Sequence, residues 1–401
     1  MPWYDNDYGY KKKITIDHTK VGGDETDFPV LISVTDNDLR DTGNGGHVQS
    51  SSGYDIIFTN GAESAQLNHE IELYVNTSGQ LVYWVKVPSL SSTVDTDIYI
   101  YYGKAGVVVD PSSTSTWDSN FVGVWHMDEA VASARDDSTS YGNDAAFNNG
   151  NPDNTLINGK IGKSIDFNDG NEYYETGSDS SLNTGTYITI ECWIYVNAFH
   201  NYEEWYQKGN DWYVLTRATE PTDSINVYIA NKSVDEDNLS DATWYHVVAT
   251  GTSGGNIYLY INGSQVDSDT GLTTTDNTET VAIGKRREAG RQPDGSLDEC
   301  RLSNSVRSGN WIGTEYENQN SPGTFMSFGA EQEKPSGATG SSIYYWDGSD
   351  HVELQRDDSS PVQLYNGSEI IGLKLGDIND ADASPIHVFD GTNIKAILKM
   401  P

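Results

Sequence analysis

Segments in which apolar and polar residues alternate follow one another along most of the chain, separated by turns rich in Gly, Asn, Asp and Ser. In the segment TYITIECWIYV, Ile188, Ile190 and Cys192 fall on one face of an expected strand, whereas Glu191 and Trp193 fall on the other. A period of two residues indicates strands with one buried face. Many such strands without a helical period predict an all-β protein built from two-sheet sandwiches closed by Greek-key connections.

Turn signals and changes of composition divide the chain into three parts. Residues 1–115 contain six strand candidates and are expected to form a first β-sandwich. After a linker rich in Ser and Thr, in which Pro111 stops any strand, residues 117–333 are expected to form a second β-sandwich. Its segment 311–329 is expected to make a short helical turn and then the closing strand of this sandwich. Residues 331–342 have the composition of a flexible tether.

The C-terminal tail, residues 343–401, contains an internal near-repeat: YYWDGSDHVEL, QLYNGSEIIGL and HVFDGTNIKAIL. Asp-Gly and Asn-Gly at the centre of a short segment favour tight hairpin turns. The tail is therefore expected to form three small β-hairpins with little core of their own. Such hairpins would gain stability by packing against copies of themselves, in a homo-oligomer, or against another protein. The alternative is an independent capping domain.

Acidic residues dominate the charge, since 60 Asp and Glu stand against 24 Lys and Arg, for a net charge of −36. Such a chain is expected to bind neither nucleic acid nor an anionic membrane through its general field. The excess of acid is spread along the whole chain, which favours a protein that works in high salt, where screening reduces self-repulsion. An ordinary acidic secreted protein with cation sites is the alternative.

Neither an apolar run long enough to cross a membrane nor an N-terminal apolar export segment is present in the sequence. Membrane insertion is therefore not expected. A chain built like an extracellular binder but without an export signal is expected in a virus particle, which leaves the cell by lysis.

The landmarks WHMDE, DDSTSYGN, GKIGKSIDF, WYHVVAT, YLYINGSQV and LDECRLSNSVRS come in one order over about half of the chain. In this order they resemble the laminin-G-like, concanavalin A-like jelly-roll family. The pattern WYDNDYGYKKKITID, DFPVLISV, YDIIFTN, LVYWVKVPSL and IYIYYG in residues 1–115 resembles DUF2341, a domain of unknown function that commonly precedes laminin-G-like modules. The tail hairpins resemble those near the ends of tailed-virus fibre proteins, and with the acidity this suggests a haloarchaeal tailed virus.

The laminin-G-like resemblance implies a calcium site on loops of the jelly roll. By this resemblance Asp137 and Asn143 of the DxSxxGN-like loop and Asp298 of the LDE strand are candidate ligands, and Asp128 of WHMDE is a further candidate. Calcium takes six to eight oxygen ligands from carboxylates and carbonyl groups on irregular loops. The alternative is that Asp137 and Asn143 hold a turn through side-chain to backbone hydrogen bonds.

Two loops offer side chains that could hold a glycan. One contains Tyr202, Trp205 and Tyr206, whose rings could stack on sugar rings. Trp212, farther along the same segment, could equally begin the next strand and belong to the core. The other is the basic loop GKRREAGRQPDG. Its candidate ligand-binding residues, Arg286, Arg287 and Arg291, suit a carboxylated or sulfated sugar or an acidic neighbouring subunit. The alternative for the basic loop is an internal counter-charge for nearby acids.

Catalytic signatures are missing from the sequence: it contains no Gly-rich phosphate loop, no GxSxG, no HExxH and no CxxC pair. Glu70 and Glu72, two apart on one expected strand, resemble the carboxylate pair of retaining glycosidases. A further acid that the glycosidase signature needs is missing, so both are expected at a solvent-facing strand edge.

His126 and His246 are expected to be packed or hydrogen-bonded. Cys192 and Cys300 form either one disulfide or two buried thiols.

These features together predict a non-enzymatic structural and adhesion component of a virus particle, such as a tail fibre, spike or head turret. Its expected partners are a host-surface glycan or glycoprotein and, through the tail, other virion proteins. A cell-surface adhesin or matrix protein of a halophile, located at the cell surface, is one alternative. A glycan-active enzyme, or its carbohydrate-binding accessory, is the other.

Overall fold

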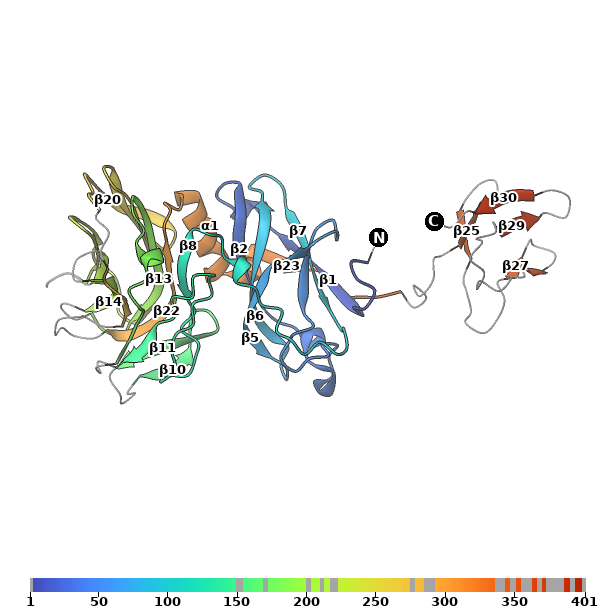
Figure 1. Cartoon of the computed structure of the whole chain (residues 1–401), viewed down its shortest axis with the longest axis horizontal. Helices are drawn as coiled ribbons and strands as arrows, with labels where there is room; N and C mark the ends of the chain where they lie inside the picture. The colour runs from blue at the N-terminus through green and yellow to red at the C-terminus, as the bar shows by residue number, and fades with distance from the viewer. Residues whose placement is uncertain are drawn as a thin grey trace. The chain divides into compact units, whose positions relative to one another are not determined.

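A computed structural model describes residues 3–148, 154–168, 172–199, 203–209, 213–216, 223–274, 278–284 and 293–335, together with the strands of the C-terminal tail. The chain divides into two compact units, Met1–Lys334 and Pro335–Pro401. The first unit contains two β-sandwiches and the second contains the tail (Figure 1). This confirms the predicted all-β fold class. No helix among the described residues is both long and apolar enough to span a membrane.

The first sandwich is made of a six-stranded sheet and a three-stranded sheet, both antiparallel. The larger sheet has the order β23-β1-β7-β3-β4, with β24 also on β1. Its strands are β1 (Tyr10–Ile16), β3 (Ile57–Asn60), β4 (Gln66–Leu67), β7 (Thr96–Tyr102), β23 (Met326–Phe328) and β24 (Gln332–Glu333). The smaller sheet has the order β2-β6-β5, with β2 (Glu25–Thr35), β5 (His69–Val75) and β6 (Gln80–Leu90).

The prediction that segment 311–329 closes the jelly roll is wrong. Its strand β23 pairs with β1 of the first sandwich, with Ile14 opposite Phe328. The expected helical turn is a 12-residue helix, α1 (Gly309–Asn320), followed by the short α2 (Pro322–Phe325). Phe325 and Met326 are buried in the core of the first sandwich, and burying these apolar side chains draws the segment there.

The second sandwich is the predicted jelly roll of two antiparallel sheets. One sheet has the order β10-β11-β22-β13-β18-β19-β20, with β8 also on β22. Its strands are β8 (Phe121–Trp125), β10 (Thr155–Asn158), β11 (Lys163–Asn168), β13 (Tyr187–Val196), β18 (Thr243–Thr252), β19 (Asn256–Ile261), β20 (Ser264–Thr270) and β22 (Asp294–Ser303). The other has the order β17-β16-β15-β14-β21-β12-β9. Its strands are β9 (Ala146–Asn148), β12 (Tyr173–Glu175), β14 (Glu204–Lys208), β15 (Tyr213–Thr216), β16 (Ile225–Ile229), β17 (Lys232–Glu236) and β21 (Val281–Ile283).

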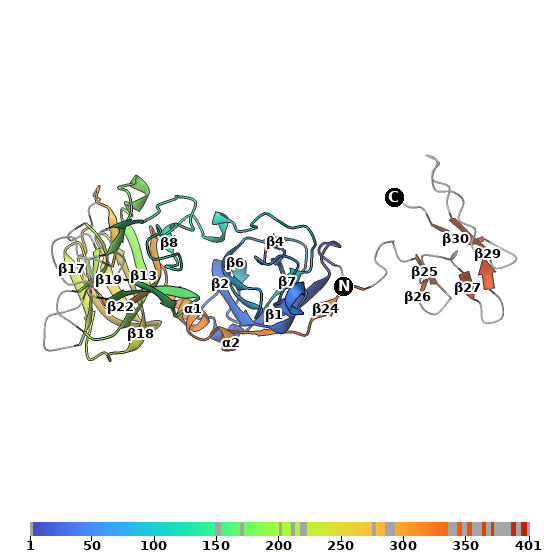
Figure 2. The same ribbon diagram turned by 90° about the horizontal axis from the view of Figure 1, so that it is seen from below.

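The two sandwiches share apolar packing. The hydrophobic core of the first sandwich continues into Val124 and Val248 of the jelly roll and into Trp311 and Ile312 of α1. Helix α1 lies at the junction of the sandwiches, beside β2 (Figures 1 and 2). There the side-chain amide of Asn318 accepts a hydrogen bond from the backbone N–H of Leu31 and donates one to its carbonyl oxygen. Leu31 belongs to edge strand β2. An edge strand whose backbone is partly satisfied in this way is less available for pairing with another chain.

The tail forms the three predicted hairpins. They are β25 (Ile343–Trp346) with β26 (His351–Leu354), β27 (Gln363–Tyr365) with β28 (Ile370–Gly372), and β29 (Ile386–Phe389) with β30 (Ile394–Leu398). Each near-repeat therefore corresponds to one antiparallel pair. Of the two alternatives for the cysteines, the structure shows buried free thiols at Cys192 and Cys300.

Candidate functional site

Acidic and imidazole side chains meet in a buried cluster where the two sandwiches touch. His126 directly follows β8, and its Nδ1 lies 2.8 Å from Glu299 Oε1 of β22. Glu72 Oε2 on β5 of the first sandwich is 3.7 Å from the same nitrogen. On the other side of the ring, Glu70 Oε2 is 3.5 Å from His126 Nε2. The imidazole of the jelly roll is thus surrounded by carboxylates from both sandwiches.

A β-bulge turns two consecutive acids of β22 toward the first sandwich. The register between β13 and β22 shifts between Glu191 and Trp193, so that this part of β22 carries an extra residue. Leu297 and Cys300 both pack in the jelly-roll core, so Asp298 and Glu299 between them face the other way. Glu299 has a left-handed backbone, with φ of 51°. Such a conformation is uncommon for a non-glycine residue and places the Glu299 carboxylate beside His126.

Indole groups from the first sandwich and the linker fix the carboxylates of β5. Trp84 Nε1 donates to Glu72 Oε2 at 2.8 Å, and Trp117 Nε1 donates to Glu70 Oε2 at 2.6 Å. The Glu72 side chain is 0% exposed and that of Glu70 is 16% exposed. The prediction of a solvent-facing edge for these residues is therefore wrong, because the jelly roll covers this face of β5.

Burial and mutual charge shift the pKa values within the cluster. Burial, and then the charge of Glu299, raise the pKa of Glu72 and of Asp298 well above their usual values. Burial alone would lower the pKa of His126, but the charges of Glu299 and Glu70 raise it well above its usual value. Burial would raise the pKa of Glu299, but His126 and Arg301 lower it. The opposite shifts of His126 and Glu299, together with their 2.8 Å contact, favour an ion pair between them.

Arg301 of β22 connects the His126 cluster to a second buried cluster, formed by Glu191, His246 and Glu315. Its guanidinium lies 2.8 Å from Glu299, 3.4 Å from Glu191 and 2.5 Å from Glu315 of α1. It also lies over the rings of Trp84 and Trp117, 4.4 and 4.9 Å from their centres. Arg301 therefore contacts two kinds of group at once. It pairs with carboxylates of the jelly roll, and it lies over aromatic rings from outside the jelly roll. His246, whose Nε2 is 3.0 Å from Glu191, is hydrogen-bonded as predicted, and so is His126.

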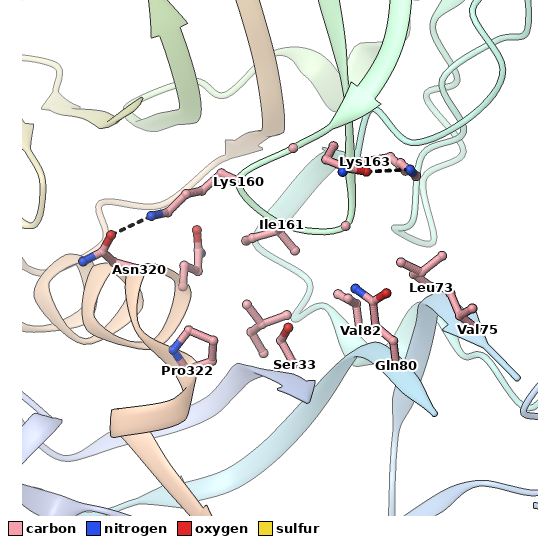
Figure 3. A pocket seen from close by; sticks show the side chains of 15 residues that line it. Ser33, Leu73, Val75, Gln80, Val82, Lys160, Ile161, Lys163, Asn320 and Pro322 are labelled. Atoms are coloured by element: carbon pink, nitrogen blue, oxygen red, sulfur yellow. Dashed lines mark hydrogen bonds between the residues drawn. The ribbon is translucent and has the colours of Figure 1, made fainter. Parts of the chain in front are cut away.

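A pocket of about 410 Å³ opens beside the cluster, between the sandwiches (Figure 3). One wall comes from β2, β6 and β5, and the other comes from the loop after β10 and from the end of α1. In Figure 3 Lys160 extends sideways to Asn320, to which its Nζ donates at 2.6 Å, and the strands that carry Ser33 and Gln80 lie across the pocket from it. The lining combines amide, hydroxyl and ammonium groups with aliphatic side chains: Leu31, Ser33, Leu73, Val75, Gln80, Val82, Asn158, Gly159, Lys160, Ile161, Gly162, Lys163, Gln319, Asn320 and Pro322.

One loop separates this pocket from the buried cluster. The backbone N–H of Ile161 donates to Asp298 Oδ2 at 2.9 Å. A Cβ atom at Gly162 would lie 2.3 Å from Glu72 Oε1, and one at Gly159 would lie 2.5 Å from Asp298 Oδ2. Only glycine allows this approach, which explains the two glycines of the GKIG motif. The pocket and the buried cluster thus lie on opposite sides of loop 159–162.

The predicted calcium ligands are divided between two places. Asp137 Oδ1 accepts hydrogen bonds from the N–H groups of Val124 and Thr139, and its Oδ2 accepts from Asn143 N–H and the Thr139 hydroxyl. The Asn143 amide donates to the carbonyl oxygen of Val122. Asp137 and Asn143 therefore anchor their loop to β8, as the turn-holding alternative describes. Nothing in these contacts leaves the Asp137 carboxylate free for calcium.

The other two predicted ligands belong to the buried cluster. Asp298 lies under loop 159–162, fully buried. Burial raises the pKa of Asp128, while the charge of His126 opposes this rise. The four residues do not form the loop site that the resemblance implied, although two of them surround His126. Calcium binding itself stays a prediction.

Aromatic rings predicted to touch a glycan are core residues where the structure describes them. Trp205 and Tyr206 on β14 are 2% and 0% exposed and pack in the jelly-roll core. Their assignment as ligand-binding residues is wrong, because the buried rings contact the core and not a ligand. Trp212, for which a core position is the alternative, lies outside the described residues. Tyr202 and the basic residues Arg286, Arg287 and Arg291 lie outside the described residues.

Comparison with known families agrees with the predicted order of the parts. Residues 52–139 match the model of DUF2341, a domain of unknown function. Residues 168–313 match the model of the concanavalin A-like lectin/glucanases superfamily. No curated protein matches the chain.

Solved structures with a similar fold include domains named for binding. The binding domain of Paraclostridial mosquitocidal protein 1 is 16% identical with a TM-score of 0.40, and the match covers 49% of this chain and 52% of that one. The binding domain of botulinum neurotoxin serotype D is 16% identical with a TM-score of 0.40, covering 50% and 52%. Domain 4 of AbnA, a GH43 extracellular arabinanase from Geobacillus stearothermophilus, solved with arabinotriose, is 15% identical with a TM-score of 0.39, covering 49% and 98%.

The chain thus spans about half the length of the two toxin domains. The segment that matches DUF2341 precedes the segment that matches the concanavalin A-like superfamily, in the order that the sequence predicted.

Proposed function

We propose that this protein is a non-enzymatic adhesion protein that binds a carbohydrate or glycoprotein on a host surface, as a structural component of a virus particle from a halophilic host. The pocket between the sandwiches carries this proposal. Its 410 Å³ volume lies within the range of small-ligand sites. Amides, a hydroxyl group and lysines around aliphatic side chains suit a sugar, which offers many hydroxyl groups and an apolar ring face.

The positive charges that line the pocket narrow the class of sugar that we propose as the ligand. Lys160 and Lys163 line the pocket of a chain with a net charge of −36. Two ammonium groups in such a protein favour a sugar that carries a carboxylate or sulfate group. Lys160 Nζ also lies 4.6 Å from the centre of the Trp193 ring, and this contact holds the lysine at the pocket wall.

Burial of the acidic pair supports a binding role over hydrolysis. Glu70 and Glu72 resemble a glycosidase pair only in their spacing. Both carboxylates accept indole N–H groups, and the Glu72 side chain lies against Gly162 and is 0% exposed. A glycosidic bond has no path to Glu72 in this arrangement.

A glycan-binding assay in molar KCl tests the ligand. We expect labelled wild-type protein to bind a subset of acidic glycans, and Lys160→Ala and Asn320→Ala each to weaken binding about tenfold, the loss of one charge-assisted hydrogen bond. Lys232→Ala is the matched control, because Lys232 on β17 pairs with Asp269 and does not line the pocket. Unchanged affinity in both pocket variants, with unchanged melting temperatures, would remove the pocket from the proposal.

The place of action needs its own experiment. The virion role is proposed from the high acidity and the tail hairpins. Mass spectrometry of purified particles should detect the chain, and antibodies against the first unit should block attachment to host cells. A cell-surface adhesin remains the second candidate, and recovery of the protein from the envelope of uninfected cells would favour it.

A further inference from the structure

Two buried oxygen atoms in the cluster at the junction of the sandwiches lack a partner. Glu72 Oε1 and Asp298 Oδ1 are shielded from solvent and accept no hydrogen bond from any residue that the structure describes. Buried carboxylate oxygens are normally bonded, since burying a charged or polar atom alone is costly. Five carboxyl groups of this cluster lie near His126 or near one another: Glu70, Glu72, Asp128, Asp298 and Glu299. Unpartnered oxygens and an excess of acid together indicate a place for a cation.

Three donor atoms are already close enough to share one ion. Ligand atoms of Glu72, His126 and Glu299 all lie within 4.8 Å of one another. His126 Nδ1 is 2.8 Å from Glu299 Oε1 and 3.7 Å from Glu72 Oε2. In a tetrahedral site with bonds of about 2.0–2.2 Å, neighbouring ligand atoms are about 3.4 Å apart. Both separations from His126 Nδ1 lie within about 0.6 Å of that value, one below it and one above it.

We propose that His126, Glu72 and Glu299 bind a divalent transition-metal ion, with zinc as its representative, and that this ion fastens the first sandwich to the jelly roll. Glu72 comes from β5, and the other two ligands come from the jelly roll. One imidazole nitrogen and two carboxylates suit zinc or manganese, whereas calcium prefers a set made only of oxygen atoms.

Each of the three proposed ligands has a hydrogen-bond partner of the kind that orients metal-binding side chains. When Nδ1 binds the ion, Nε2–H faces Glu70 Oε2 at 3.5 Å, a carboxylate–histidine–metal relay. Trp84 donates to Glu72, and Arg301 donates to Glu299 Oε2 at 2.8 Å. Each ligand is thus held by a partner of its own.

The neighbouring cluster of Glu191, His246 and Glu315 is a weaker candidate. These residues also bring ligand atoms within 4.8 Å of one another. However, Arg301 Nη1 already lies between its carboxylates, 3.4 Å from Glu191 and 2.5 Å from Glu315. A guanidinium group thus supplies the positive charge there.

Metal analysis of the full-length protein in molar KCl tests the inference. After treatment with chelator and dialysis, we expect wild-type protein to bind one equivalent of Zn²⁺. At a hundredfold excess over Kd its melting temperature should rise by roughly 3 °C or more. Glu72→Gln preserves the shape of the side chain and its acceptor for Trp84. It should nevertheless weaken zinc binding at least tenfold, and so should His126→Gln.

His18→Gln is the matched control, because His18 belongs to an exposed group with Asp17 and Asp95. We expect this variant to bind zinc as the wild type does. Substitution of Co²⁺ into wild-type protein adds a measurement that needs no variant, since intense visible bands report a site of low coordination number.

Three results would overturn the inference: zinc binding that Glu72→Gln leaves unchanged, a Co²⁺ spectrum equal to that of the aqueous ion, or stabilisation by Ca²⁺ equal to that by Zn²⁺.

Discussion

Replacement of Arg301 by leucine tests whether buried charge holds the two sandwiches together. The side chain is 1% exposed and lies within 3.4 Å of three carboxylates. Removing one partner of a buried ion pair costs about 3–5 kcal/mol, and a buried cation–π contact adds about 2 kcal/mol. Because Arg301 serves the carboxylates and two indole rings together, we expect Arg301→Leu to lower the free energy of unfolding by about 5 kcal/mol.

Urea unfolding at constant molar KCl measures this loss. Tryptophan emission is a suitable signal, because Trp84 and Trp117 lie against Arg301. With a slope of about 3 kcal/mol/M for a unit of this size, the midpoint should fall by about 1.5 M urea. Far-UV circular dichroism recorded in parallel separates parting of the sandwiches from loss of the strands.

Two further variants make the result interpretable. Arg40→Leu is the matched control, because the half-buried Arg40 donates only to the nearby Asn37 carbonyl oxygen among its described contacts. In the double variant Arg301→Leu/Glu315→Gln, the carboxyl group that has lost its partner Arg301 is replaced by a neutral amide, so part of the lost stability should return. If Arg301→Leu changes stability by less than about 1 kcal/mol, as a surface substitution would, the reasoning about this interface is refuted.

Two other predictions follow from the charges. The melting temperature should rise steadily between about 0.1 and 3 M KCl, because screening relieves the repulsion of a net charge of −36, and a melting curve insensitive to salt would contradict the adaptation to high salt. Burial would raise the pKa of Asp118, but two hydrogen bonds from Arg307 and its charge lower it below 3.8. This pair therefore stabilises the fold above about pH 4 and loses its contribution as pH falls through the folded pKa. Arg307→Gln should cost about 3 kcal/mol at pH 7 in urea titrations, and a difference from wild type that stays constant down to pH 2 would contradict this assignment.

Periodicity predicted the strands well because it reflects local burial. The alternating segments became strands, and each Asp-Gly or Asn-Gly repeat became one hairpin. The run Leu81–Val85 carries a further signal: five consecutive apolar residues, all buried, indicate a strand covered on both faces. That run could have shown that another layer packs on the smaller sheet of the first sandwich.

The cluster between the sandwiches could not be predicted from the sequence. Spacing correctly put Glu70 and Glu72 on one face of a strand, but it cannot say whether solvent or another domain covers that face. The bulge that turns Asp298 and Glu299 to one side breaks the alternation on which the prediction depended. His126, more than fifty residues beyond Glu72 in the sequence, joins them only through the packing of the two sandwiches. Chemistry at a contact between sandwiches is set by tertiary structure, which local patterns do not contain.

The position of the pocket connects binding to the junction of the sandwiches. Its walls come from the strands of the first sandwich, from loop 159–162 of the jelly roll and from the end of α1. A ligand that touches all three walls binds only when the two sandwiches are docked, so it must stabilise the docked state by its own binding free energy. Contacts of His126 with Glu70 and Glu72 of β5, and of Arg301 with the Trp84 ring, fix the relative orientation of the sandwiches more narrowly than apolar packing alone, because each charge has a defined partner across the junction. Weakening this junction should therefore weaken binding in the pocket, even though Arg301 does not line it.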